Sequence, residues 1–87
     1  MATINYLVLT RPGYEALGQQ ELVPGRTRLW INEGILDDEA IAHCESLSVE
    51  LRVLPHTVDP GRQGEVATAI EAIEAEFPDE EVMAEYR

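Results

Sequence analysis

Four strand-like segments alternate with three helix-like segments along this 87-residue chain, and this order constrains its fold more than any other feature. The strand-like segments cover residues 4–10, 27–32, 49–54 and 82–86, and the helix-like segments cover residues 14–22, 37–47 and 66–77. A helix between two strands carries the chain back to the edge where the next strand can start in parallel. The order therefore predicts a small α/β domain of the form β-α-β-α-β-α-β, with a largely parallel four-stranded sheet.

The side-chain pattern of the strands predicts how this sheet is covered. The first strand is apolar on both faces, so we expect it at the centre of the sheet. Residues 49–54 alternate between apolar and polar side chains, which indicates one buried face and one largely wet face. We therefore expect the helices mainly on one face. Trp30, Leu54 and Met83 should then point away from the helices.

Two of the helices have clear signals. Asp37 is a natural N-cap, and acidic residues follow it in the first turn. Val66, Ile70, Ile73 and Phe77 recur at the spacing of one helix face, which should pack against the sheet. A ferredoxin-like α+β arrangement is the alternative fold. It requires that the segment after Asp37 not form a full helix.

Proline and glycine residues set the other boundaries. Arg11-Pro12-Gly13 should end the first strand, so that the first helix starts at Tyr14. Asp59, which precedes a proline, should cap the last helix, whose regular part starts at residue 63 or beyond. Residues 82–86 suggest an edge strand, with a short helix as the alternative.

Length and composition predict one compact domain over residues 1–87, because 45% apolar residues are too many for a disordered chain. The lone Cys44 has no disulfide partner within the chain and suits a reducing compartment. The first residues lack a basic start, and the longest apolar run, 6–9, is far below the roughly 18 residues of a membrane span. We expect a cytoplasmic protein without a membrane segment. Arginine without lysine, with abundant alanine and glutamate, fits a GC-rich bacterial genome.

The charge is strongly negative and one-sided. The chain contains no lysine and has a formal net charge of −11. Phosphate-loop, Schiff-base and general-base lysines are therefore excluded. Residues 37–87 hold fourteen carboxylates and three arginines, a balance that repels nucleic-acid phosphates, so we expect no binding to nucleic acid.

The acidity is densest near the end of the chain, where residues 65–86 carry eight carboxylates and no basic side chain. A solvated surface that keeps a small protein soluble is one interpretation. A docking surface for a basic protein partner is the other, and methionine and tyrosine, which are common at interfaces, support it. The candidate partner-binding residues are Glu71, Glu74, Asp79, Glu80, Glu81, Met83 and Tyr86.

Polar residues also follow three of the predicted strands. The carboxyl ends of parallel strands meet at one edge of a sheet, where ligands bind in α/β proteins. Arginines at this edge could hold an anion, with a histidine as a titrating group. Ordinary turn and capping roles are the other interpretation. The candidate ligand-binding residues are Arg11, Asn32, Glu33, His56, Asp59 and Arg62.

The other motifs are weaker evidence for a functional site. Residues 61–64 read Gly-Arg-Gln-Gly, but the flanking carboxylates would repel the phosphates that such a loop binds in KH domains. His43 and Cys44 are neighbours on a predicted helix, so they project about 100° apart and do not form a catalytic pair. Two histidines and one cysteine lack a zinc-ligand spacing. We expect no metal, no cofactor and no catalytic residue.

These observations favour a small binding or regulatory module that acts through protein contacts and has no catalysis of its own. A homodimer is expected, because apolar area on an uncovered sheet face would drive self-association. The alternative is a small anionic-ligand-binding protein, or a weak enzyme, that uses the polar edge of the sheet.

Overall fold

The helices and strands follow the predicted order in the computed structural model, which describes residues 3–17 and 22–85. The elements are β1 (Ile4–Val8), α1 (Arg11–Leu17), β2 (Thr27–Ile31), α2 (Asp38–Ser46), β3 (Glu50–Val53), α3 (Gln63–Glu76) and β4 (Glu81–Glu85). The strands form one four-stranded sheet with the order β3-β2-β1-β4, and every pair is parallel. The predicted small α/β domain with a parallel sheet is confirmed, and the ferredoxin-like alternative is excluded.

Two predictions about individual strands are confirmed. β1 lies between β2 and β4, as its two apolar faces indicate. The last segment is an edge strand and not a short helix, and it pairs with β1 in the register Tyr6 to Met83. Its final predicted residue, Tyr86, lies outside the described part of the chain.

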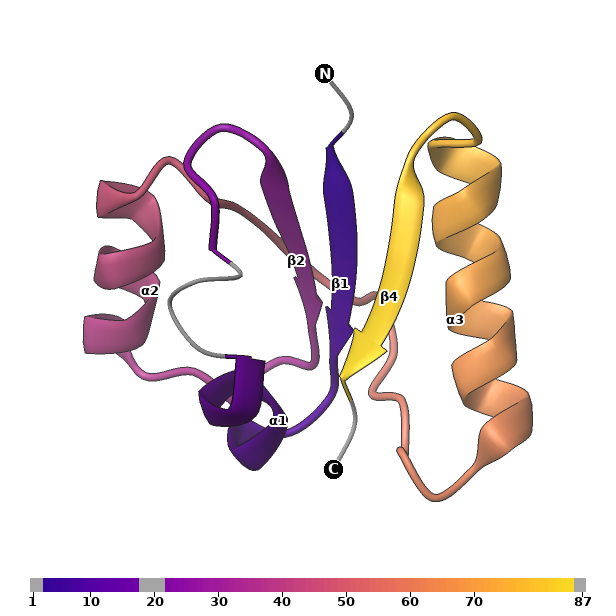
Figure 1. Cartoon of the computed structure of the whole chain (residues 1–87). Helices are drawn as coiled ribbons and strands as arrows, with labels where there is room; N and C mark the ends of the chain where they lie inside the picture. The colour runs from indigo at the N-terminus through magenta and orange to yellow at the C-terminus, as the bar shows by residue number, and fades with distance from the viewer. Residues whose placement is uncertain (1–2, 18–21, 86–87) are drawn as a thin grey trace.

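The three helices divide between the two faces of the sheet (Figure 1). α1 and α2 cover the face that carries Tyr6, Val8 and Leu29. α3 covers the opposite face, which carries Leu7 and Trp30. The β1–β2 and β2–β3 connections cross the sheet in one direction, whereas β3–β4 returns past β1. Since such crossovers are almost always right-handed, this reversal sends α3 to the other face.

The expectation that Trp30, Leu54 and Met83 share one face that points away from the helices is therefore wrong. Trp30 is 7% exposed and Leu54 is 9% exposed, and both belong to the cluster beneath α3. Met83, on the edge strand β4, is in register with Tyr6 and so lies on the face of α1 and α2, with 47% of its surface exposed. Within the described residues, both faces of the sheet carry helices, so the fully uncovered apolar face from which we expect a homodimer is not found there.

α1 begins three residues earlier than predicted. The Thr10 hydroxyl accepts a hydrogen bond from the Gly13 amide at 3.0 Å, and the Thr10 carbonyl accepts one from the Tyr14 amide at 3.0 Å. Pro12 thus falls in the first turn, where a missing N–H costs no hydrogen bond. The residues read as a breaker in fact start the helix. The predicted end of this helix, over 18–22, lies largely outside the described residues.

The predicted caps of the other helices have different outcomes. Asp37 caps α2, because its Oδ1 accepts a hydrogen bond from the Ala40 amide at 2.8 Å. α3 starts at Gln63, as expected, but its N-cap is Arg62 and not Asp59. The Asp59 carboxylate instead accepts a hydrogen bond from the Gly61 amide at 2.8 Å, within the turn that precedes the helix.

A polar cluster fixes the end of α3 against the sheet. Asn5, at the centre of the sheet, has a fully buried side chain that donates to Glu80 Oε1 at 2.9 Å and accepts from Trp30 Nε1 at 3.0 Å. The Arg28 guanidinium donates to Asn5 Oδ1 at 3.0 Å, to Glu80 at 2.6 Å and to Glu50 at 3.0 Å. It also stacks 3.8 Å above the centre of the Phe77 ring. These contacts join β1, β2, β3 and the α3–β4 turn.

This cluster should make stability depend on acid titration. The hydrogen bond from Asn5, followed by Arg28, holds the pKa of Glu80 below its usual value, and Arg52, followed by Arg28, does the same for Glu50. A carboxyl whose pKa is lowered by folding stabilises the fold above its unfolded pKa of about 4.3, and this contribution is lost as the pH falls through the folded value.

We therefore expect the difference in unfolding free energy between the wild type and a Glu80→Gln variant to be largest near neutral pH. It should shrink as the pH falls below about 4. Urea unfolding of both proteins across this range measures the difference, and the comparison cancels the relief of general charge repulsion that acid brings to both. A difference that stays constant with pH would show that Glu80 is not held as a carboxylate by this cluster.

Candidate binding groove

Asn32, one of the predicted edge residues, is a structural link between loops. Its side chain is buried and donates to the carbonyl oxygens of Leu9 at 3.0 Å and Val58 at 2.8 Å. Its Oδ1 accepts a hydrogen bond from the Val58 amide at 2.8 Å. These hydrogen bonds all join the Asn32 side chain to the segments that follow β1 and β3. Asn32 is therefore not available to a ligand.

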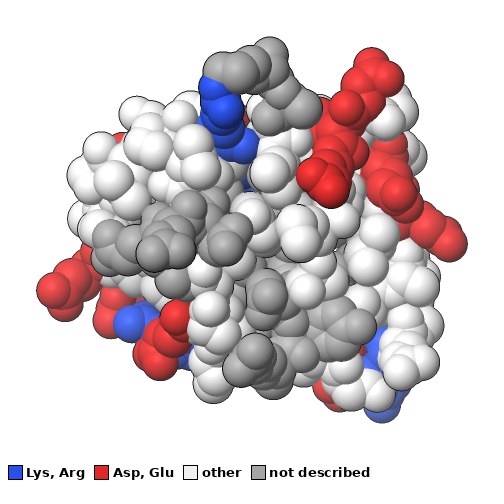
Figure 2. Space-filling view, viewed as in Figure 1, with Lys and Arg blue, Asp and Glu red and all other residues white. Residues whose placement is uncertain are grey.

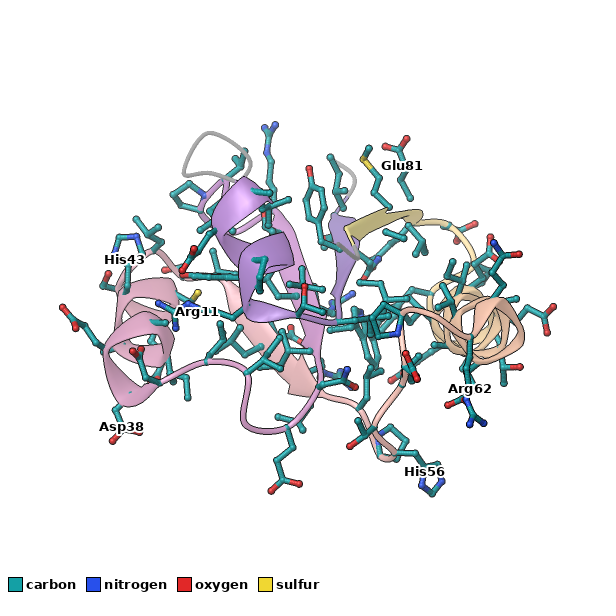
Figure 3. The ribbon with its side chains drawn as sticks, turned by 90° about the horizontal axis from the view of Figure 1, so that it is seen from below. Arg11, Asp38, His43, His56, Arg62 and Glu81 are labelled. Carbon is teal, nitrogen blue, oxygen red and sulfur yellow. The ribbon has the colours of Figure 1, made fainter. Side chains whose placement is uncertain are left out.

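The other predicted edge residues do not gather into one site. The Arg11 guanidinium lies 3.2 Å from Glu15 and 3.6 Å from Asp37, beside α2. His56 and Arg62 lie on the other side of the sheet, near the start of α3 (Figure 3). Glu33 is exposed in the loop after β2, and Asp59 stabilises its own turn. The single anion site expected from the sequence thus separates into two regions.

The region around Arg11 is a small depression of about 260 Å³. It is lined by Arg11, Tyr14, Asp37, Glu39, Ala40 and His43. The Tyr14 hydroxyl lies 3.6 Å from the Cys44 sulfur beneath it. Burial, followed by this contact with Cys44, raises the pKa of Tyr14 to about 12. Tyr14 and Cys44 here form part of the packing between α1 and α2, and Cys44 is fully buried, as its place on the apolar helix face indicates.

His56 and Arg62 contribute to a larger groove between α3 and the segment that follows β3. The groove has a volume of about 770 Å³, which falls within the range of ligand-binding clefts. Trp30, Leu54 and Ile73 line it from the sheet and from the helix. The remaining lining residues are Pro55, His56, Val58, Arg62, Gly64, Glu65, Thr68, Ala69, Ala72 and Glu76.

The groove results from the way in which one helix covers a four-stranded face. α3 packs over β1 and β4, where it meets Leu7, Val82 and Ala84. Trp30, on β2, and Leu54, just after β3, belong to the same cluster and line the groove beside the helix. The side of α3 that faces them carries small residues at positions 64, 68 and 72, which leave space that larger side chains would fill.

The cationic side chains around the groove all have acidic partners. Arg62 lies 3.5 Å from Glu65 and 3.9 Å from Asp59. Near the other end, Arg52 lies 3.3 Å from Glu76, and its guanidinium sits 5.4 Å from the centre of the Trp30 ring. Because these arginines are neutralised locally, the groove has an apolar floor and a mixed, net acidic rim.

The predicted acidic surface is only partly a free surface. The side chains of Glu71, Glu74, Asp79 and Glu81 are exposed. Glu80 is half-buried and holds Arg28, so it has a structural role. Figure 2 shows acidic side chains gathered around the turn between α3 and β4. Tyr86, the last of the predicted partner-binding residues, lies outside the described residues.

The groove could not be found from sequence periodicity, because its floor depends on the strand order. The only available signal is the row of small residues, Gly64, Thr68 and Ala72, at a spacing of four along the strongest predicted helix. Such a row indicates that one side of a helix leaves room for a neighbour. It does not show which element provides the opposite wall.

Comparisons with known proteins add no assignment: no protein-family model matches the chain, and neither the curated proteins nor the solved structures contain a match. Within residues 3–17 and 22–85, no helix is long and apolar enough to cross a membrane. No group of three or more histidine, cysteine or acidic side chains in the same two ranges could hold a metal ion.

Proposed function

We propose that this chain is a small non-catalytic binding module that acts through protein contacts in the cytoplasm. Its binding surface is the groove between α3 and the segment after β3. The observation that carries the proposal is the groove of about 770 Å³, whose lining includes Trp30, Leu54 and Ile73. Burying such a surface against a partner is favourable at about 25 cal/mol per Å².

The composition of the groove supports a binding role. Aromatic and aliphatic side chains surrounded by a few polar ones are typical of sites that hold a partner's apolar side chains. The charge of −11 disfavours nucleic acid as the partner, because its phosphates would be repelled.

A second candidate function is the binding of a small ligand with an apolar body and an anionic group. His56 and Arg62 favour it, because both line the same groove. The acidic partners of Arg62 and the negative charge of the chain weaken it. We therefore place a protein partner first.

The single tryptophan provides a direct test of groove binding. Titration with Nile red, a neutral apolar dye, should raise the dye emission and lower the Trp30 emission, because Trp30 lines the groove. An Ala72→Gln variant should bind the dye about fivefold more weakly or worse, since the dye would then bury an unpaired amide. Ala67→Gln is the matched control, because Ala67 is exposed on the same helix but does not line the groove.

Equal dye affinity in the two variants, or no change in the Trp30 emission, would contradict the assignment of the groove as the binding surface. Octanoate separates the two candidate functions. If octanoate displaces the dye and the Arg62→Gln variant loses this displacement, the small anionic ligand becomes the preferred function. If octanoate does not displace the dye from the wild type, the protein partner remains preferred.

A further inference from the structure

The groove beside α3 is the place on this face of the sheet where a second helix would lie next to α3. Four strands spaced about 4.8 Å apart span about 14 Å between the outer two, and helices that pack side by side lie 8–10 Å apart. The opposite face fits this estimate, since it is covered by both α1 and α2. The α3 face is covered by one helix and by the segment after β3, whose Val58 is buried in the same cluster, and the groove lies between them beside Trp30.

The walls of the groove suit a helix with an apolar stripe. α3 contains 14 residues and is therefore about 21 Å long at 1.5 Å per residue, enough to contact three to four turns of a neighbour. Gly64, Thr68 and Ala72 permit close approach along this length, and a Cβ added at Gly64 would meet no atom within 4 Å. Trp30 and Leu54 supply a floor for aliphatic side chains.

The negative charge around the groove indicates which kind of partner helix would bind there. The two arginines beside the groove, Arg52 and Arg62, are paired with carboxylates, and Glu65 and Glu76 line the groove itself. Residues 63–85 carry eight carboxylates and no basic side chain. A second copy of this chain would bring another −11 against the same surface. The negative electrostatic field of these carboxylates would attract a basic helix and would speed its association.

We propose that the groove receives a basic amphipathic helix of a partner protein, seated beside α3 with its apolar stripe on Trp30 and Leu54. This inference rests on the proposed function and names the chemistry of the partner. The basic face of the helix lies outward, where it meets Glu65 and Glu76 along the rim. The helix completes the second layer of helices on this face of the sheet.

Three synthetic peptides test the proposal against the full chain. The first is a tryptophan-free helix of about 15 residues with leucines at i, i+3, i+4 and i+7 and lysines elsewhere. The second replaces the lysines with glutamates, and the third scrambles the first so that no apolar stripe remains. Trp30 fluorescence reports binding to the groove. We expect the basic helix to bind at least about tenfold more tightly than the acidic one at low salt, with a smaller ratio at high salt.

The scrambled peptide should leave Trp30 unchanged, and Ala72→Gln, but not Ala67→Gln, should weaken the basic helix. Three results would overturn the inference: equal affinity for the acidic helix, equal affinity for the scrambled peptide, or a dimer in sedimentation that dissociates when the dye is added. If any of these occurs while Nile red still binds at the groove, the proposed function survives without this partner. If Nile red does not bind, both fail.

Discussion

Replacing Ile73 with alanine is expected to lower the free energy of unfolding by about 2–5 kcal/mol, a large share of the stability of so small a domain. Ile73 is 1% exposed and packs between α3 and the sheet in the same cluster as Leu7 and Trp30. Its removal deletes buried methyl groups and leaves a cavity that the neighbouring backbone cannot close completely. Urea unfolding followed by circular dichroism measures the loss.

Val53→Ala is the matched control, because Val53 is an aliphatic residue with 56% of its surface exposed on the edge strand β3. The free energy of unfolding of this variant should stay within about 0.5 kcal/mol of the wild-type value. If Ile73→Ala behaves like this control, α3 does not pack through that face, and the core described beneath it is wrong.

An Arg28→Met variant should be destabilised by about 2–4 kcal/mol, although methionine retains much of the apolar volume. The Arg28 side chain is 12% exposed and contacts Asn5, Glu50 and Glu80 at once. Removing it leaves a buried amide oxygen and the Glu80 carboxylate with fewer donors. Its stacking on Phe77 is also lost.

Arg62→Met provides the comparison for this second variant, since the Arg62 side chain is 74% exposed and its ion pairs are at the surface. Such pairs contribute about 0–1 kcal/mol. Similar urea midpoints for the two variants would mean that the Arg28 cluster contributes no more than a surface pair. A clear loss only for Arg28→Met would confirm that the cluster anchors the end of α3.

Local sequence signals predicted the elements well because their causes are local. The capping of α2 by Asp37 requires only the amide of Ala40, three residues away. The helical spacing of Val66 and Ile73 needs only two turns of regular backbone, and both side chains are buried in α3. The parallel sheet also follows from the order of elements, since each strand is separated from the next by a helix.

The position of α3 on the opposite face was not predicted, because it depends on where β4 lies in the sheet. The alternation of residues 49–54 indicated one wet face, but it cannot show that β3 is an edge strand. An edge strand can expose Val53 on one side while Leu54 is buried on the other. Once β4 pairs with β1 on the side opposite β2, the last crossover must change faces, and Trp30 becomes covered.

The sequence places all of the candidate ligand-binding residues at one edge of the sheet. It does not show on which face of the sheet each of them lies. Arg11 follows β1 and Arg62 lies in the segment after β3, but the two arginines lie on opposite faces of the sheet (Figure 3). Asn32 has the residue type of a ligand-binding amide, yet its hydrogen bonds close the loops around it. A sequence pattern cannot distinguish an amide that binds a ligand from one that binds its own backbone.

Amide chemical-shift mapping with the basic helix peptide tests the central claim most directly, because it locates the contact without a substitution. We expect the largest shifts at the Trp30 indole N–H, Leu54 and Ala72, along the groove beside α3. The amide signals of Ala40 and Cys44, on the buried side of α2 and on the other face of the sheet, should not shift. Shifts confined to Glu71 and Glu74, or centred on α2, would show that the peptide binds by charge alone or elsewhere, and would contradict the groove as the binding surface.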